Sequence, residues 1–217
     1  MSWFRSRCHF DYSWFRCPPI LTHVAPFIPP NRPVIGPLKE KEKIPGVDVC
    51  VGEGDRVKFG SVEATVLDVG GHTNGHIAYH FPADRKVFTG DALFALGCGR
   101  MFEGTPPQFW RSLRSLRDLP DDTTVYCAHE YTESNAKFAL SVEPGNPDLV
   151  ARCQEVFEKR RRDEPTVPSL LGVEKKTNPF LRIDISDEIR KNVGVTGEDS
   201  DDVAFAKVRK AKDNFRG

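Results

Sequence analysis

The chain has 217 residues, enough for one α/β domain with or without a small appendage. Its 31 basic side chains balance 31 acidic ones, so no overall field favours nucleic acid or an anionic membrane as a partner. No apolar run could span a bilayer. The six cysteines are scattered without a Cys-x-x-Cys pair, which is typical of reduced thiols. We expect a cytoplasmic monomer, with a mitochondrial location as the alternative because the chain starts with basic and aromatic residues.

The first part of the chain, residues 1–32, is aromatic and rich in proline and has no clear periodicity. Regular patterns begin at Val34, and apolar alternation bounded by turn residues predicts several strands from there. In chain order these strands are 47–51, Arg56–Phe59, 61–69, Ile77–Phe81, 86–89 and Thr124–Cys127. The pattern within residues 61–69 places Val62, Ala64 and Val66 on one face.

Four helices are expected in the second half of the chain. The first follows Thr105, a good N-cap with Pro106 in the first turn and Gln108 completing a capping box, and it ends before Pro120. Its apolar stripe is Phe109, Leu113 and Leu116. Helices at 133–142 and 147–162 follow, the latter capped by Asn146. The last helix is expected at about 200–215, with Val203, Phe205, Ala206 and Val208 mostly on one side.

Three short loops, each at the end of a predicted strand, carry residue types that bind metals. They contribute His72, Asp91 and His129. Loops at strand ends can bring side chains together while a rigid sheet holds them. Imidazole and carboxylate groups bind Zn²⁺ and also suit Fe or Mn, and the two oxygens of Asp91 could bridge two ions about 3.5–4 Å apart. His80 lies within a strand and is expected to be structural, and His76 is expected to orient a ligand or a loop rather than to bind metal.

Several motifs together resemble the glyoxalase II (hydroxyacylglutathione hydrolase) family, from about Val34 to Phe215. They are Gly71-His72-Thr73-Asn74-Gly75-His76, Phe88-Thr89-Gly90-Asp91-Ala92-Leu93-Phe94, Gly97-Cys98-Gly99-Arg100, Tyr126-Cys127-Ala128-His129-Glu130-Tyr131-Thr132, Glu143-Pro144-Gly145-Asn146, Glu164-Pro165-Thr166-Val167-Pro168-Ser169, Asn178-Pro179-Phe180-Leu181-Arg182 and Arg209-Lys210-Ala211-Lys212-Asp213. The resemblance implies an α/β fold, the αββα sandwich of metallo-β-lactamases, with a helical C-terminal domain. It also implies hydrolysis of S-D-lactoylglutathione to D-lactate and glutathione, a step in methylglyoxal detoxification.

The resemblance also implies roles for individual residues. His72 would bind one metal ion, Asp91 would bridge, and His129 would bind the other ion and contact substrate. The remaining substrate-binding residues would be Arg100, Phe102, Tyr131, Arg209 and Lys212. Cationic side chains are natural partners for the two carboxylates of glutathione. Relatives carry tyrosine where this chain has Phe102, which lacks the hydroxyl, so the strength of glutathione binding is expected to differ.

The family's first metal motif, Thr-His-x-His-x-Asp-His, is only partly present. Thr22-His23 matches its beginning, but no His-x-Asp-His follows. His23 is therefore a candidate fourth ligand, and a replacement zinc site at Cys8, His9, Cys17 and His23 is a less favoured alternative because its spacing matches no standard finger. A catalytic zinc usually has three protein ligands and a water whose pKa falls from about 15.7 to about 7. We expect single or weak metal occupancy and reduced turnover.

The sequence predicts three regions: an atypical segment 1–32, a truncated metallo-β-lactamase-like core 33–131, and a helical substrate-binding domain 132–217. Two functions stay open. One is a metal-dependent thioester hydrolase, and the other is a catalytically impaired relative that binds glutathione conjugates. A one-iron persulfide dioxygenase is a third reading, disfavoured by the helical C-terminal region. An altered splice or a misassigned gene start would explain why the family pattern breaks off inside the metal motif.

Overall fold

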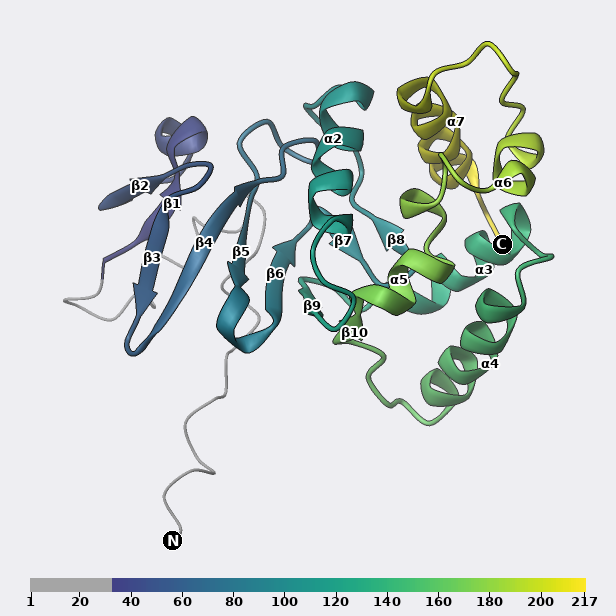
Figure 1. Ribbon diagram of the computed structural model, residues 1–217, viewed down its shortest axis with the longest axis horizontal. Helices are drawn as coiled ribbons and strands as arrows, with labels where there is room; N and C mark the ends of the chain where they lie inside the picture. Colours follow the sequence, from purple (N-terminus) through teal and green to yellow (C-terminus); the bar gives the residue numbers. More distant parts are fainter. Residues whose placement is uncertain (1–32) are drawn as a thin grey trace, which may run out of the picture.

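The computed structural model describes residues 33–217. Its centre is a six-stranded sheet in the order β10-β9-β6-β5-β4-β3 (Figure 1). The strands are β3 (Arg56–Phe59), β4 (Val62–Asp68), β5 (Ile77–Phe81), β6 (Lys86–Gly90), β9 (Thr124–Cys127) and β10 (Ser169–Leu170). Neighbouring strands are antiparallel except β6 and β9, which are parallel because a helical crossover joins them. Five of these six strands match the sequence prediction to within one residue at either end.

Two small sheets flank the central one. Strand β1 (Ile35–Pro37) pairs in parallel with β2 (Val49–Val51), and the 3₁₀ helix η4 (Leu38–Lys43) lies between them in sequence. Strands β7 (Leu93–Phe94) and β8 (Gly97–Cys98) form a short hairpin after β6. A further 3₁₀ turn, η5 (Pro82–Asp84), connects β5 and β6. Apart from β2, which shortens the predicted strand 47–51, the strands of these small sheets were not predicted because two- and three-residue strands carry too little alternation to recognise.

Helix α2 (Pro106–Arg117) covers one face of the central sheet, as Figure 1 shows. The Thr105 side chain accepts a hydrogen bond from the Gln108 backbone N–H, so the predicted N-cap is confirmed. The reciprocal half of the capping box is not formed, because the Gln108 side-chain amide donates to the Asn74 carbonyl instead. The predicted stripe is fully buried and belongs to the main core together with residues of the facing strands. This core includes Phe109, Leu113 and Leu116 of α2 and, from the strands, Ala78, Val87 and Val125.

The opposite face of the sheet has its own apolar cluster. It is formed by alternate residues of neighbouring strands: Val57, Ala64, Val66, Tyr79 and Phe81, with Val51 from β2. The predicted shared face of residues 61–69 is therefore confirmed for Ala64 and Val66, whereas Val62 at the strand end is exposed. The sheet thus separates two cores, as a layered α/β fold requires.

The second half of the chain is helical. Its elements are α3 (Thr132–Val142), α4 (Pro147–Arg161), α5 (Leu171–Thr177), the 3₁₀ turn η6 (Pro179–Leu181), α6 (Asp187–Asn192) and α7 (Asp201–Asn214). Helix α4 is capped by the Asn146 side chain, which accepts from the Leu149 N–H at 3.2 Å, as predicted. The predicted apolar side of α7 is wrong at Val203, which is exposed, because the buried face runs through Ala204, Phe205 and Val208.

Helix α7 packs beside α2, so the last helix of the chain contacts the helix that covers the sheet (Figure 1). The Phe205 ring contacts the Phe109 ring of α2 edge to face, with centroids 5.4 Å apart. The predicted α/β class and the helical C-terminal region are confirmed. In the described part of the chain, no helix is both long and apolar enough to cross a bilayer.

Candidate metal centre

Three loops meet at one edge of the central sheet. His72 lies between β4 and β5, Asp91 directly follows β6, and His129 is the second residue after β9. These strands are neighbours, so their ends bring the three loops together. The approach requires a residue without a side chain at Gly99, where a Cβ atom would lie 2.0 Å from the Asp91 carbonyl oxygen. The glycines around the predicted ligands therefore have a packing reason.

The carboxylate of Asp91 lies between the two imidazole rings. Its Oδ1 is 3.1 Å from Nε2 of His129, and its Oδ2 is 3.7 Å from Nε2 of His72. Asp91 and His72 are buried, whereas His129 is partly open to solvent. The structure thus brings together the three side chains that the sequence singled out, with Asp91 in the middle.

The orientation of His72 is set by its other ring nitrogen. Nδ1 lies 2.8 Å from the Arg100 carbonyl oxygen, which can only accept a hydrogen bond. Nδ1 therefore carries a proton, so in the neutral ring Nε2 presents its lone pair toward Asp91. Oδ1 of Asp91 is buried and has no hydrogen-bond partner among the described residues. Electron-rich atoms that face one another in a buried space are the donor set of a cation site.

His76 contacts the same loop but from behind. The backbone N–H of Asp91 donates to Nε2 of His76 at 3.0 Å, and burial lowers the pKa of His76. A neutral ring that accepts at Nε2 must carry its proton on Nδ1. His80 lies within β5, and burial also lowers its pKa. The prediction that His76 supports the site and His80 belongs to the strand agrees with these positions.

The three side chains do not complete a two-ion centre. Within residues 33–217, no group of three or more His, Cys, Asp or Glu side chains is arranged to enclose an ion. His72 and His129 each approach Asp91, but as separate pairs. The donor atoms of these three side chains suit a metal ion, but their arrangement does not fit the expected two-ion centre. His23 and the alternative ligands Cys8, His9 and Cys17 lie outside the described residues.

Aromatic side chains form the rim of the site. The Tyr131 ring stacks on His129 with centroids 4.8 Å apart, and the Phe102 ring lies 5.1 Å from His72. Both aromatic side chains are strongly exposed, at 50% and 67%. Exposed rings beside buried polar groups are a suitable surface for the apolar parts of a ligand. Phe102 and Tyr131 are thus close to the predicted ligands.

The predicted cationic residues occupy different environments. Arg209 is buried, and its guanidinium donates to the Cys98 carbonyl at 2.9 Å and to the Asp213 carboxylate at 3.0 Å. Lys212 is half-buried and donates to the Ser134 carbonyl and hydroxyl, both at 3.0 Å. Burial, with Arg209 and Arg100 nearby, lowers the pKa of Lys212 to about 8. Of the three cations, Arg100 is the exposed one.

Residues that the sequence did not single out hold the first loop. Glu40 of η4 is buried and accepts from the Gly75 N–H at 2.9 Å. Glu103 accepts from the Asn74 N–H at 3.1 Å and pairs with Lys43 at 2.8 Å. The charged stretch around Glu40 looks like a solvated surface in the sequence, so no local pattern could have indicated this role.

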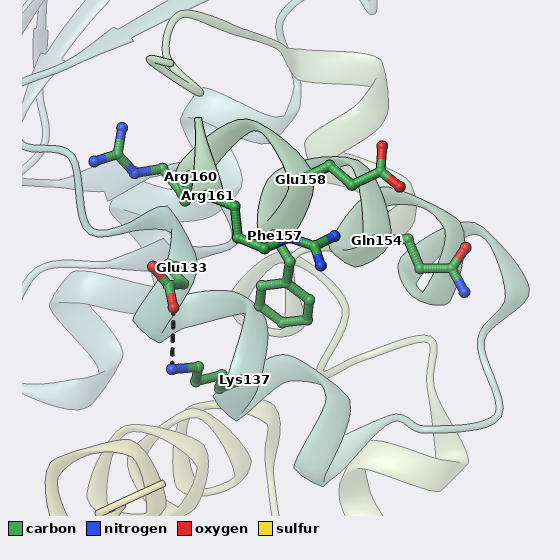
Figure 2. Close-up of a pocket in the computed structure, with 7 residues that line it drawn as sticks. All are labelled: Glu133, Lys137, Gln154, Phe157, Glu158, Arg160 and Arg161. Atoms are coloured by element: carbon green, nitrogen blue, oxygen red, sulfur yellow. Dashed lines mark ion pairs between the residues drawn. The ribbon is translucent and has the colours of Figure 1, made fainter. Parts of the chain in front are cut away.

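A separate pocket of about 480 Å³ lies between α3 and α4 (Figure 2). Its lining residues are Glu133, Lys137, Gln154, Phe157, Glu158, Arg160 and Arg161. Figure 2 shows the Phe157 ring between the two helices and the ion pair of Glu133 with Lys137, whose atoms are 3.1 Å apart. None of the predicted site residues lines this pocket, and its mixed charges select no one ligand class.

Two models of known protein families match this chain. The Metallo-beta-lactamase superfamily model matches residues 9–129, and the Hydroxyacylglutathione hydrolase C-terminus model matches residues 130–215. A solved metallo-beta-lactamase from Staphylococcus aureus superposes with a TM-score of 0.51 at 19% identity, covering 87% of this chain and 51% of that one. The sheet with its covering helices therefore has the metallo-β-lactamase fold, and the chain is a member of that superfamily.

Closer relatives define the family. A protein from Methylococcus capsulatus named hydroxyacylglutathione hydrolase is 50% identical over 85% of this chain and 71% of its own length. One from Erythrobacter litoralis with the same name is 53% identical over 84% of this chain and 70% of its own length. The chain belongs to the hydroxyacylglutathione hydrolase (glyoxalase II) family, a family of hydrolases.

Proposed function

We propose that this chain is a metal-dependent thioester hydrolase that converts S-D-lactoylglutathione to D-lactate and glutathione, and so acts in methylglyoxal detoxification. The observation that carries the proposal is the position of Asp91 between His72 and His129 in a chain about half identical to named hydroxyacylglutathione hydrolases. Turnover is expected to be low because the described residues supply only these three ligands. A single bound ion, Zn²⁺ or alternatively Fe or Mn, would lower the pKa of a bound water and so supply the nucleophile.

The chain's own residues have separate tasks in this proposal. Asp91, His72 and His129 hold the ion, with His23 as a further candidate ligand. Phe102 and Tyr131 offer exposed rings to the thioester next to His72 and His129. Arg100 and Lys212 supply positive charge for the glutathione carboxylates. Arg209 contributes its charge from a buried position and fixes the Cys98–Gly99 backbone, which leads to Arg100.

The division of labour follows the proposed domains. Residues 33–131 would carry the ligands, and residues 132–217 would carry Arg209 and Lys212, while 1–32 form an atypical segment. The partner is a glutathione thioester rather than nucleic acid or a membrane, and the protein acts as a cytoplasmic monomer.

The test is metal content measured beside hydrolysis on the full chain. The purified protein is loaded in turn with Zn²⁺, Fe²⁺ and Mn²⁺ and assayed with S-D-lactoylglutathione and with the lactoyl thioester of N-acetylcysteamine. We expect up to one ion per chain, hydrolysis that rises with occupancy, and preference for the glutathione ester, because the control ester lacks both carboxylates. Two ions per chain with turnover equal to the relatives would refute the three-ligand account.

A second function, binding without hydrolysis, is favoured by the incomplete ligand set. The same experiment separates the two. Saturable binding of the glutathione thioester without product, at every metal loading, would make this chain an impaired relative that binds glutathione conjugates. Hydrolysis above the metal-free chain would exclude that reading.

A further inference from the structure

The loop that carries Asp91 is tied from behind to His76, a residue that the proposed function does not use. The Asp91 N–H donates to Nε2 of His76 at 3.0 Å. The same nitrogen lies 3.3 Å from the Thr89 carbonyl oxygen. A backbone N–H can only donate, so the shorter contact decides the direction: Nε2 accepts, and the contact with Thr89 is not a second hydrogen bond.

The backbone around Gly90 is shaped to admit the ring. Gly90 has φ +53, a left-handed conformation that favours glycine. A Cβ atom there would lie 2.6 Å from Nε2 of His76. The turn from Thr89 to Asp91 therefore folds closely around the imidazole, and the ring takes the place that a side chain would fill. This close fit indicates that the contact between His76 and the Thr89–Asp91 turn is specific.

His76 is itself firmly placed. Its carbonyl accepts from the Val69 N–H at 2.9 Å, and the preceding Gly75 N–H donates to the buried Glu40 carboxylate at 2.9 Å. Strand β5 begins at the next residue. His76 is also four residues after His72, and their rings lie edge to face with centroids 5.8 Å apart. One short segment thus carries a candidate ligand and the group that holds the next candidate ligand.

We propose that His76 is a positioning residue for hydrolysis: its Nε2 holds the Asp91 backbone so that the carboxylate stays between His72 and His129. The inference rests on the proposed function for its effect on the reaction. The hydrogen bond between Asp91 and His76 does not depend on that function. Partners behind a ligand set its direction, and losing one typically weakens a site by about 10–100-fold.

The experiment compares three variants of the full chain. His76→Leu removes the acceptor and keeps bulk. His76→Gln puts an amide oxygen near the position of Nε2 and can still accept. His80→Leu is the matched control, because it changes another histidine of the same region, one that lies within β5. Amide hydrogen exchange at Asp91 and the separate values of kcat and KM are measured for each.

We expect His76→Leu to speed exchange of the Asp91 amide by at least about tenfold, and to lower kcat by about 10–100-fold with KM changed less than about twofold. His76→Gln should restore most of both, and His80→Leu should alter neither. If His76 had only a structural role, His76→Leu and His76→Gln would lose kcat to the same extent. Unchanged exchange at Asp91 in His76→Leu, or a loss carried by KM alone, overturns the proposal.

A measurement on the unchanged chain guards against variants that do not fold. In ¹⁵N-labelled protein, the Asp91 amide nitrogen and His76 Nε2 should be coupled across the hydrogen bond, and the shift of Nε2 should be that of an unprotonated nitrogen. A protonated Nε2 without coupling overturns the assignment. If the unchanged chain proves unable to hydrolyse the thioester, the proposed function fails while the exchange and coupling data still decide the role of His76.

Discussion

Two buried carboxylates in this molecule have opposite surroundings. Glu174, in the helical half, accepts hydrogen bonds from the Leu96 N–H at 2.9 Å, from the Asn178 amide at 3.1 Å and from the Arg152 guanidinium. Asp91, at the sheet edge, faces two imidazole rings and has one oxygen without a hydrogen-bond partner among the described residues.

Burying a carboxylate is costly unless donors compensate for the lost water. Around Glu174 the compensation is complete, and the group connects α5 to the β7–β8 hairpin and to α4. Asp91 instead faces the Nε2 atoms of His72 and His129, which stabilise a carboxylate only when a cation or a proton lies between them. A buried carboxylate with all its hydrogen bonds therefore indicates a structural role, and one that lacks hydrogen bonds indicates a site for chemistry.

Among the substitutions that test this difference, Asp91→Asn is expected to have the largest effect. We expect at least about a 100-fold loss of kcat, because removing a ligand should exceed the loss from a partner behind it. Stability should stay within about 1 kcal/mol, because Oδ1 of the carboxylate has no hydrogen bond to lose among the described residues. Turnover and thermal unfolding are measured together, with Asp118→Asn at the end of α2 as the control. A folded Asp91→Asn chain with normal turnover would remove Asp91 from the site.

Glu174→Gln should behave in the opposite way. Loss of the charge weakens the bonds with Arg152 and Leu96, which we expect to cost about 2 kcal/mol. For a chain of this size the melting temperature should fall by about 6 °C. kcat and KM per folded molecule should not change. A loss of kcat without a loss of stability would mean that the two carboxylates do not divide structure and chemistry in this way.

The strands that lead into the site were predicted because their turns and alternation are local signals. The role of His76 behind Asp91 was also expected, but the contact made by Glu40 was not. Glu40 is part of a lysine- and glutamate-rich stretch, and only the tertiary fold reveals that it meets the Gly75 N–H. Helices α5 and α6 are also too short to carry a full apolar period.

The burial of the cationic residues on helix α7 also could not be predicted from the local sequence. Arg209 and Lys212 are three residues apart, which puts both on one face of a helix but does not say how deeply that face is buried. The structure places the Arg209 guanidinium in the interior, above the Phe180 ring, and leaves Lys212 half-open. Packing of α7 against α2 and the η6 turn decides this difference, and such long-range packing has no counterpart in the local sequence.

Lys212 provides a pH test of the helical half. Burial lowers its pKa to about 8, so its charge is present below that pH and is lost as pH rises through it. If the charge binds a glutathione carboxylate, KM should rise severalfold between about pH 7 and pH 9 while kcat changes less. Lys212→Arg should lose this dependence because guanidinium stays protonated. A KM that is flat across this range in the unchanged chain would exclude Lys212 from substrate binding.

The smallest expected effect is at the rim. Phe102→Tyr adds a hydroxyl, and one added hydrogen bond at an exposed position should lower KM by about two- to threefold. Phe102→Leu, which keeps an apolar side chain without the ring, is the companion variant and should raise KM. Equal KM values for all three chains would show that position 102 does not contact substrate.

The proposed hydrolysis depends most on whether one ion binds between the three strand-end side chains. Crystals of the full chain grown with Zn²⁺ should give one anomalous peak at the zinc edge, about 2.0–2.2 Å from Nε2 of His72, Nε2 of His129 and an oxygen of Asp91. The same peak should vanish in Asp91→Asn. A peak held by other residues, or no peak near Asp91 while the protein hydrolyses the thioester, would contradict the account.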